Sequence, residues 1–110
     1  MLLADVLERC HRQERTGLLN IAVVQSSLFP LRIYIEKGII SRFSYGPLTG
    51  NDCLDFLPYY DLGQADYLDG MRTSRGSGMH VPTEMAIDSI RRMGKSIRMR
   101  RWFEGGDSHA

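Results

Sequence analysis

Acids and nucleophiles are present in the sequence, but their spacing does not form a catalytic motif. Asp52 and Asp55 fall within an expected helix, and Asp61 lies just beyond it. Paired carboxylates can carry acid–base catalysis, but an acid near a helix N-terminus ordinarily stabilises the helix dipole. Ser41 and Ser44 have no neighbouring base in the sequence. We therefore predict no catalytic residue and no enzymatic activity, although the residue types alone leave a small hydrolase or transferase open.

The histidines and cysteines lack the spacing of a metal-ligand set. His11, His80 and His109 lie far apart along the chain, and none has a cysteine or an acid at metal-ligand spacing. Cys10 and Cys53 each fall within a helical pattern, which favours reduced, buried thiols that behave as small apolar side chains. We predict no metal site and no cofactor.

The tripeptide Gly94-Lys95-Ser96 is similar to the end of a phosphate-binding loop. That loop requires a glycine five positions before its second glycine, where this chain has Ser89. The loop also follows a strand, whereas residues 83–93 have the pattern of a helix. Both differences exclude a phosphate-binding loop at this position.

A basic stretch near the end of the chain is the sharpest feature. Residues 1–90 contain 8 basic and 11 acidic residues, whereas residues 91–110 contain 6 basic and 2 acidic ones. Such a run is most often a solvated face. The functional alternatives are an acidic protein partner, an anionic membrane surface and nucleic acid. Membrane insertion is the weakest of these, because Ile97, Met99 and Trp102 do not form a helical stripe.

A second candidate contact is the apolar pair Leu28 and Phe29 in the connecting stretch 25–30. Loop apolar side chains usually fold back onto the core, and the alternative is that both stand exposed for a partner. Together with the basic stretch, these residues give the candidate partner-binding set, which is Leu28, Phe29, Arg91, Arg92, Lys95, Arg98, Arg100, Arg101 and Trp102.

Length and composition bound the remaining possibilities. A chain of 110 residues with 43% hydrophobic and 25% charged residues is typical of one globular domain. No apolar run approaches the roughly 18 residues of a membrane span, and the first residues lack the basic region of a signal peptide. We therefore expect a cytoplasmic protein without a membrane span.

The elements are organised around a β-hairpin at residues 31–46. Leu31, Ile33 and Ile35 alternate with polar residues, which is the period of a half-buried strand. The structural turn residue is Gly38, which suits a type I turn closed by a glycine bulge because glycine adopts positive φ at little cost. Other patterns predict helices at residues 2–14, about 49–57 and 83–93, and strands at 18–24 and 65–69.

These elements predict an α+β fold, with an antiparallel sheet of about four strands and with an N-terminal, a middle and a C-terminal helix packed on it. Residues 1–94 would form the single domain, and residues 95–110 would form a basic, aromatic C-terminal segment with a flexible tail. Residues 70–80 are rich in glycine and serine and are expected to be a flexible loop.

Several motifs resemble the PATAN domain family of bacteria, and the similarity covers residues 2–93. In chain order they are LADVL, TGLLNI, LRIYIEKGII, GNDCLDFL, DLGQADY and PTEMAIDSIRR. The resemblance implies an adaptor that binds other proteins, often fused to a response-regulator receiver domain, and in some members active in surface motility. The 110 residues are expected to form one such domain without a receiver domain.

We therefore predict a non-enzymatic protein–protein interaction module in bacterial signal transduction or motility control. The alternative is a nucleic-acid-binding protein that acts through its basic C-terminal segment. We also expect a homodimer, because short strands with a bare sheet edge invite pairing.

Overall fold

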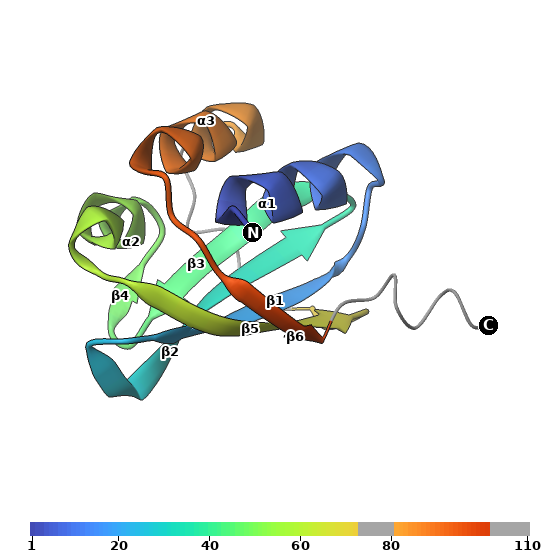
Figure 1. The fold of residues 1–110 in the computed structure, drawn as a ribbon. Coiled ribbons are helices and arrows are strands. Elements are labelled where there is room, and N and C mark those ends of the chain that lie inside the picture. The colour runs from blue at the N-terminus through green and yellow to red at the C-terminus, as the bar shows by residue number, and fades with distance from the viewer. Residues whose placement is uncertain (73–80, 102–110) are drawn as a thin grey trace.

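A computed structural model gives the fold, and it describes residues 1–72 and 81–101. Within these residues, three helices and one short 3-10 turn lie on one side of a six-stranded sheet (Figure 1). The strands are β1 (Gly17–Val23), β2 (Ser26–Glu36), β3 (Ile39–Tyr45), β4 (Leu48–Thr49), β5 (Leu62–Asp69) and β6 (Arg98–Arg101). The helical elements are α1 (Leu3–Arg12), α2 (Asn51–Phe56), η1 (Leu57–Tyr59) and α3 (Thr83–Met93).

The α+β class is confirmed, but the prediction of an antiparallel sheet of about four strands is wrong. The strand order is β4-β3-β2-β1-β5-β6, and the sheet is mixed because β6 runs parallel to β5. The connection from β5 to β6 passes through α3, which returns the chain to the starting end of β5 as a parallel crossover requires. The other additional strand, β4, pairs only with Ser44 and Tyr45 at the end of β3.

The core lies between the sheet and the helices. Alternate strand residues such as Leu19, Ile33 and Phe43 are fully buried against the helical layer. Helix α1 contributes its own apolar stripe, which is Leu3, Ala4, Val6, Leu7 and Cys10. Cys10 and Cys53 are both buried free thiols, as predicted, and burial raises the pKa of the Cys53 thiol to about 11, so it stays protonated at neutral pH.

The central hairpin forms where predicted, with a different turn. Lys37 and Gly38 both have positive φ, 52° and 81°, as in a primed two-residue turn. The expected glycine bulge is absent from the turn, and the register shift falls farther along at Ser41. The turn is fixed to the end of α1, because the Gly38 N–H donates to the Arg15 carbonyl and the His11 Nδ1–H donates to the Gly38 carbonyl, each at 2.8 Å.

The stretch after α3 is part of the sheet up to Arg101. Ile97 is buried, and its N–H donates to the Met1 carbonyl at 2.8 Å. Ser96 forms a β-bridge with Leu2, so residues 95–101 pack with the remainder of the domain rather than beyond it. Residues 73–80 of the predicted loop at 70–80, and residues 102–110 of the predicted C-terminal segment and tail, lie outside the described residues.

Candidate functional site

The strongest candidate site lies on the face of the sheet that faces away from the helices. Helices α1, α2 and α3 all lie over the opposite face, and no helix in the described part of the chain covers this one (Figure 1). We call it the open face. Strand alternation directs a mostly polar set of side chains to this face. The set includes Asn20, Ala22, Arg32, Tyr34, Arg42, Ser44, Gln64, Asp66, Arg98 and Arg100.

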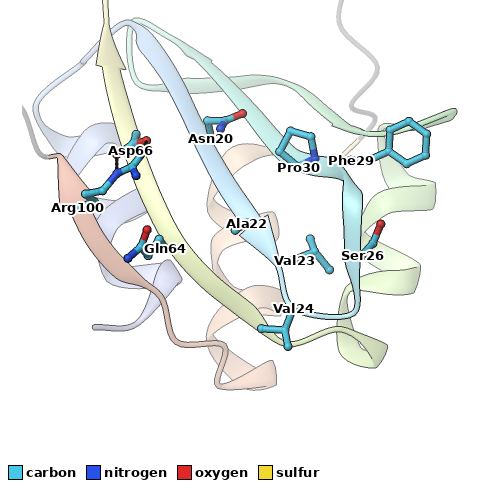
Figure 2. A pocket seen from close by; sticks show the side chains of 10 residues that line it. All are labelled: Asn20, Ala22, Val23, Val24, Ser26, Phe29, Pro30, Gln64, Asp66 and Arg100. Carbon is cyan, nitrogen blue, oxygen red and sulfur yellow. Dashed lines mark hydrogen bonds and ion pairs between the residues drawn. The ribbon is translucent and has the colours of Figure 1, made fainter.

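A groove of about 440 Å³ crosses the open face over β1 (Figure 2). Its floor is at Ala22, whose small side chain leaves the space between β2 and β5 unfilled. The amide side chains of Asn20 and Gln64 border the floor. Val24 lies near the β1–β2 turn, and Pro30 lies on the β2 side of the groove (Figure 2). We call the side of the groove toward this turn and β2 its apolar end, and the side toward β5 and β6 its polar end.

A long bulge in β2 stands beside the apolar end of the groove. Ile21 pairs with Leu31 and Val23 pairs with Ser26, so one β1 residue faces the four residues 27–30 of β2. Pro30 lacks an N–H and cannot complete a regular ladder here, which fits a bulge at this point. Leu28 on this bulge is 80% exposed and Phe29 is 43% exposed.

The interpretation that both apolar residues fold back is wrong for Leu28 and holds in part for Phe29. The Phe29 ring meets Tyr45 edge to face, with 6.2 Å between ring centroids. It also lies 2.9 Å from where a Cβ on Gly46 would stand, so glycine is needed for this approach. Phe29 is thus anchored, and it presents the neighbouring Leu28 to solvent.

An ion pair closes the polar end of the groove. Arg100 on β6 donates to both carboxylate oxygens of Asp66 on β5, at 3.1 and 2.7 Å (Figure 2). These hydrogen bonds lower the pKa of the Asp66 carboxyl. The pair ties the edge strand β6 to β5 and neutralises Arg100.

Two residues of the predicted basic set stabilise the fold. Arg91 on α3 donates to Asp5 at 2.7 Å and to Glu8 at 2.5 Å, which fixes α3 against α1. Lys95 donates through Nζ to the Tyr60 carbonyl at 2.6 Å and to the Pro58 carbonyl at 3.1 Å, at the end of η1. Neither side chain belongs to the open face.

The remaining predicted residues separate by location. Arg92 is exposed on α3 with a 3.4 Å hydrogen bond to Ser89. The side chains of Arg98 and Arg101 on β6 have no hydrogen bond or ion pair to any residue within 1–72 and 81–101. Arg98 pairs in register with Gln64 beside the groove. Trp102 lies outside the described residues.

Sequence reasoning missed Arg32, Asn20 and Gln64. Arg32 is exposed on β2 and pairs in register with Asn20, which borders the groove. The available signal was strand alternation, since Arg32 lies between the buried Leu31 and Ile33. Arg32 and Arg98 share the open face only because of the strand order, with β1 and β5 between their two strands, and no local pattern reveals that order.

The described residues were also compared with the requirements of a membrane-spanning helix and of a metal site. No helix there is long and apolar enough to cross a membrane. No group of three or more histidine, cysteine, aspartate or glutamate side chains within residues 1–72 and 81–101 is placed to hold a metal ion.

Comparison of the chain with protein-family models, curated proteins and solved structures found no match. The resemblance of residues 2–93 to the PATAN family therefore remains a prediction from sequence. The structural features that bear on function are the groove on the open face and the β2 bulge beside it.

Proposed function

We propose that the protein is a non-enzymatic module that binds another protein through the groove and the β2 bulge. The observation that carries this proposal is the exposure of Leu28 and Phe29 beside a groove on the open face. Exposed apolar side chains are individually common on protein surfaces, but several of them at a concave site are typical of an interaction surface.

The apolar group has three members at one end of the sheet. Val24 in the β1–β2 turn is 67% exposed, and both Val24 and Phe29 line the groove. Leu28 directly precedes Phe29 on the bulge. The edge-to-face contact with Tyr45 holds Phe29 in place before any partner arrives. A surface that is ordered in advance loses less conformational entropy when it binds.

The resemblance to the PATAN family supports an adaptor role in bacterial signal transduction or motility control. An adaptor needs a docking surface and a stable scaffold, and it needs no catalytic group. We place this activity in the cytoplasm, in agreement with the sequence expectation.

Nucleic-acid binding is the second candidate, and one observation favours it. Arg32 and Arg98 are exposed on the open face without ion-pair partners in the described residues, and Tyr34 lies on the same face. Arginine and aromatic side chains on a sheet can bind phosphates and stack on bases. The engagement of Arg91 and Lys95 in the fold reduces the cations available for this purpose.

The test is affinity capture from the source cell with three baits. The wild-type chain and Met85→Asp, a change at an exposed apolar residue on α3, are expected to retain the same protein. Leu28→Asp is expected to lose it, because a charge would be placed in the apolar contact. Retention by all three baits, or by none, would contradict the proposed surface.

A salt titration separates the two candidates. Labelled single-stranded DNA and RNA are added to the wild-type chain at low and at physiological salt. Binding to nucleic acid falls steeply with salt because bound counterions are released. Submicromolar binding at physiological salt would put the second candidate first.

A further inference from the structure

We infer that the groove binds a short, extended segment of a partner protein in which acidic residues flank one apolar side chain. This inference rests on the proposed function and specifies its partner. It follows from what lies at the two ends of the groove and from the charges beside it.

The apolar end of the groove is the reason that we infer one apolar side chain in the partner segment. Ala22 forms the floor, while Val24, Pro30 and Phe29 form the walls at this end. The groove volume of about 440 Å³ lies within the range of small binding sites. Burial of one aliphatic or aromatic side chain here would cover apolar surface that is now in contact with water.

Two amide side chains in the groove are the reason that we infer an extended main chain in the partner segment. Asn20 on β1 and Gln64 on β5 border the floor of the groove (Figure 2). Each amide side chain offers both a donor and an acceptor. A peptide main chain also presents donors and acceptors, so these two amides can pair with it without specifying its side chains.

The arginines beside the groove are the reason that we infer acidic residues on both sides of the apolar one in the partner segment. Arg98 pairs in register with Gln64 and Arg32 pairs in register with Asn20, so an arginine stands beside each amide. Neither arginine has an ion-pair partner among residues 1–72 and 81–101. Asp66, the acid in the groove, is already bound by Arg100. The charge that lacks an ion-pair partner beside the two amides is therefore positive, which complements carboxylates.

The same charges argue against two other occupants. A second copy of the chain, placed face to face, would bring its own Arg32 and Arg98 against this pair, and like charges would repel. A nucleic-acid strand would satisfy the arginines, but it would leave Val24 and Leu28 without an apolar partner. An acidic segment with one apolar residue satisfies both ends.

The experiment begins with a displayed library of random peptides selected on the full chain. The selected peptides are expected to carry Asp or Glu on both sides of a single aliphatic or aromatic residue. One of them is then labelled and titrated against four proteins by fluorescence anisotropy. These are the wild-type chain, Ala22→Phe, Arg98→Glu and Arg92→Glu.

The variants separate the shape of the groove from its charge. Ala22 is exposed on the open face, so Ala22→Phe fills the groove without entering the core and is expected to weaken binding roughly tenfold or more. Arg98→Glu is expected to weaken it by a similar factor. Arg92→Glu makes the same charge change on α3, and it is expected to leave the affinity within about twofold of wild type. Thermal melting checks that each variant is folded.

Several outcomes would overturn the inference. These are selected peptides without acidic residues, no selected peptide at all, or equal losses for Arg98→Glu and Arg92→Glu. A dimer seen by light scattering that Ala22→Phe converts to monomer would identify a second copy as the occupant. Displacement of the peptide by labelled single-stranded DNA or RNA at physiological salt would identify nucleic acid.

Failure of this inference is distinguishable from failure of the proposed function. If the selected peptides are not acidic but Leu28→Asp still loses the captured protein, only the chemistry of the partner is wrong. If Leu28→Asp retains that protein, the binding surface itself is wrong.

Discussion

The two faces of the sheet differ although the same strands build both. Along β2, Leu31 and Ile33 are buried against the helices, while Arg32 between them is exposed on the open face. Along β1, Leu19 is buried and Asn20 borders the groove. Adjacent residues therefore face different surroundings: one set packs in the core under the helices, and the other borders the groove or solvent on the open face.

The largest expected effect tests this separation within β2. Ile33 is fully buried, so Ile33→Ala is expected to destabilise the protein by about 2–5 kcal/mol through lost burial and a cavity. Arg32→Ala, one residue away on the open face, is expected to change the free energy of unfolding by less than about 0.5 kcal/mol. Urea denaturation of both variants measures the difference. A loss at Arg32 comparable to that at Ile33 would mean that the open face is covered.

How far the sequence predicts this arrangement depends on whether the pattern is local. The central hairpin and the three helices follow from periodicity within short windows. Strand β6 does not, because Arg98, Arg100 and Arg101 leave Met99 as its one apolar residue. Its pairing with β5 depends on contacts with a strand about thirty residues earlier.

The candidate site was predicted only in part for the same reason. Leu28 and Phe29 were conspicuous as apolar residues in a connecting stretch, but the register that makes them bulge depends on β1. The residues of the basic run could not be told apart in the sequence, but the fold places them in different surroundings. Arg91 and Lys95 stabilise packing, whereas Arg98 faces solvent beside the groove.

The second expected effect is a difference in stability between substitutions at two glycines with nearly equal φ angles. Gly38 has φ +81° and a Cβ there would lie 2.6 Å from the His11 carbonyl oxygen, whereas Gly70 has φ +82° with nothing within 4 Å. Gly70→Ala is expected to cost about 1 kcal/mol from backbone strain alone. Gly38→Ala should cost about 2–3 kcal/mol, since the hairpin turn must also move away from α1.

Thermal or urea unfolding of the two glycine variants gives the difference directly. Equal losses would show that the turn does not depend on its contact with α1. The bulkier Gly38→Val is expected to exceed Gly38→Ala, because β-branched residues are more strained at positive φ.

The smallest effect concerns the ion pair of Asp66 and Arg100 at the edge of the open face. Its hydrogen bonds lower the pKa of the Asp66 carboxyl below the ordinary value of 3.8. The stability from this pair is therefore fully present above pH 3.8, and it is lost as the pH falls through the lower folded-state pKa. The wild-type chain is expected to be more stable than Asp66→Asn at neutral pH, and the advantage should vanish in strong acid.

Urea midpoints measured from neutral to strongly acidic pH test this dependence. Asp55→Asn makes the same chemical change at an exposed position on α2, and it is expected to show a smaller difference from wild type. If Asp66→Asn tracks the wild-type midpoint at every pH, the ion pair does not hold β6 to the sheet.

The contact between the first residues and the residues before β6 has a consequence for the order of folding. The Leu3 N–H donates to the Lys95 carbonyl at 2.9 Å, and Leu2 bridges Ser96, so this contact joins the two ends of the described chain. Closing so long a loop costs more entropy than closing the β1–β2 and β2–β3 hairpins. During synthesis α1 emerges before the sheet strands, yet its docking is completed only when residues 95–97 are available. We expect the hairpins to form early and the start of α1 to remain accessible to proteases until β6 pairs with β5.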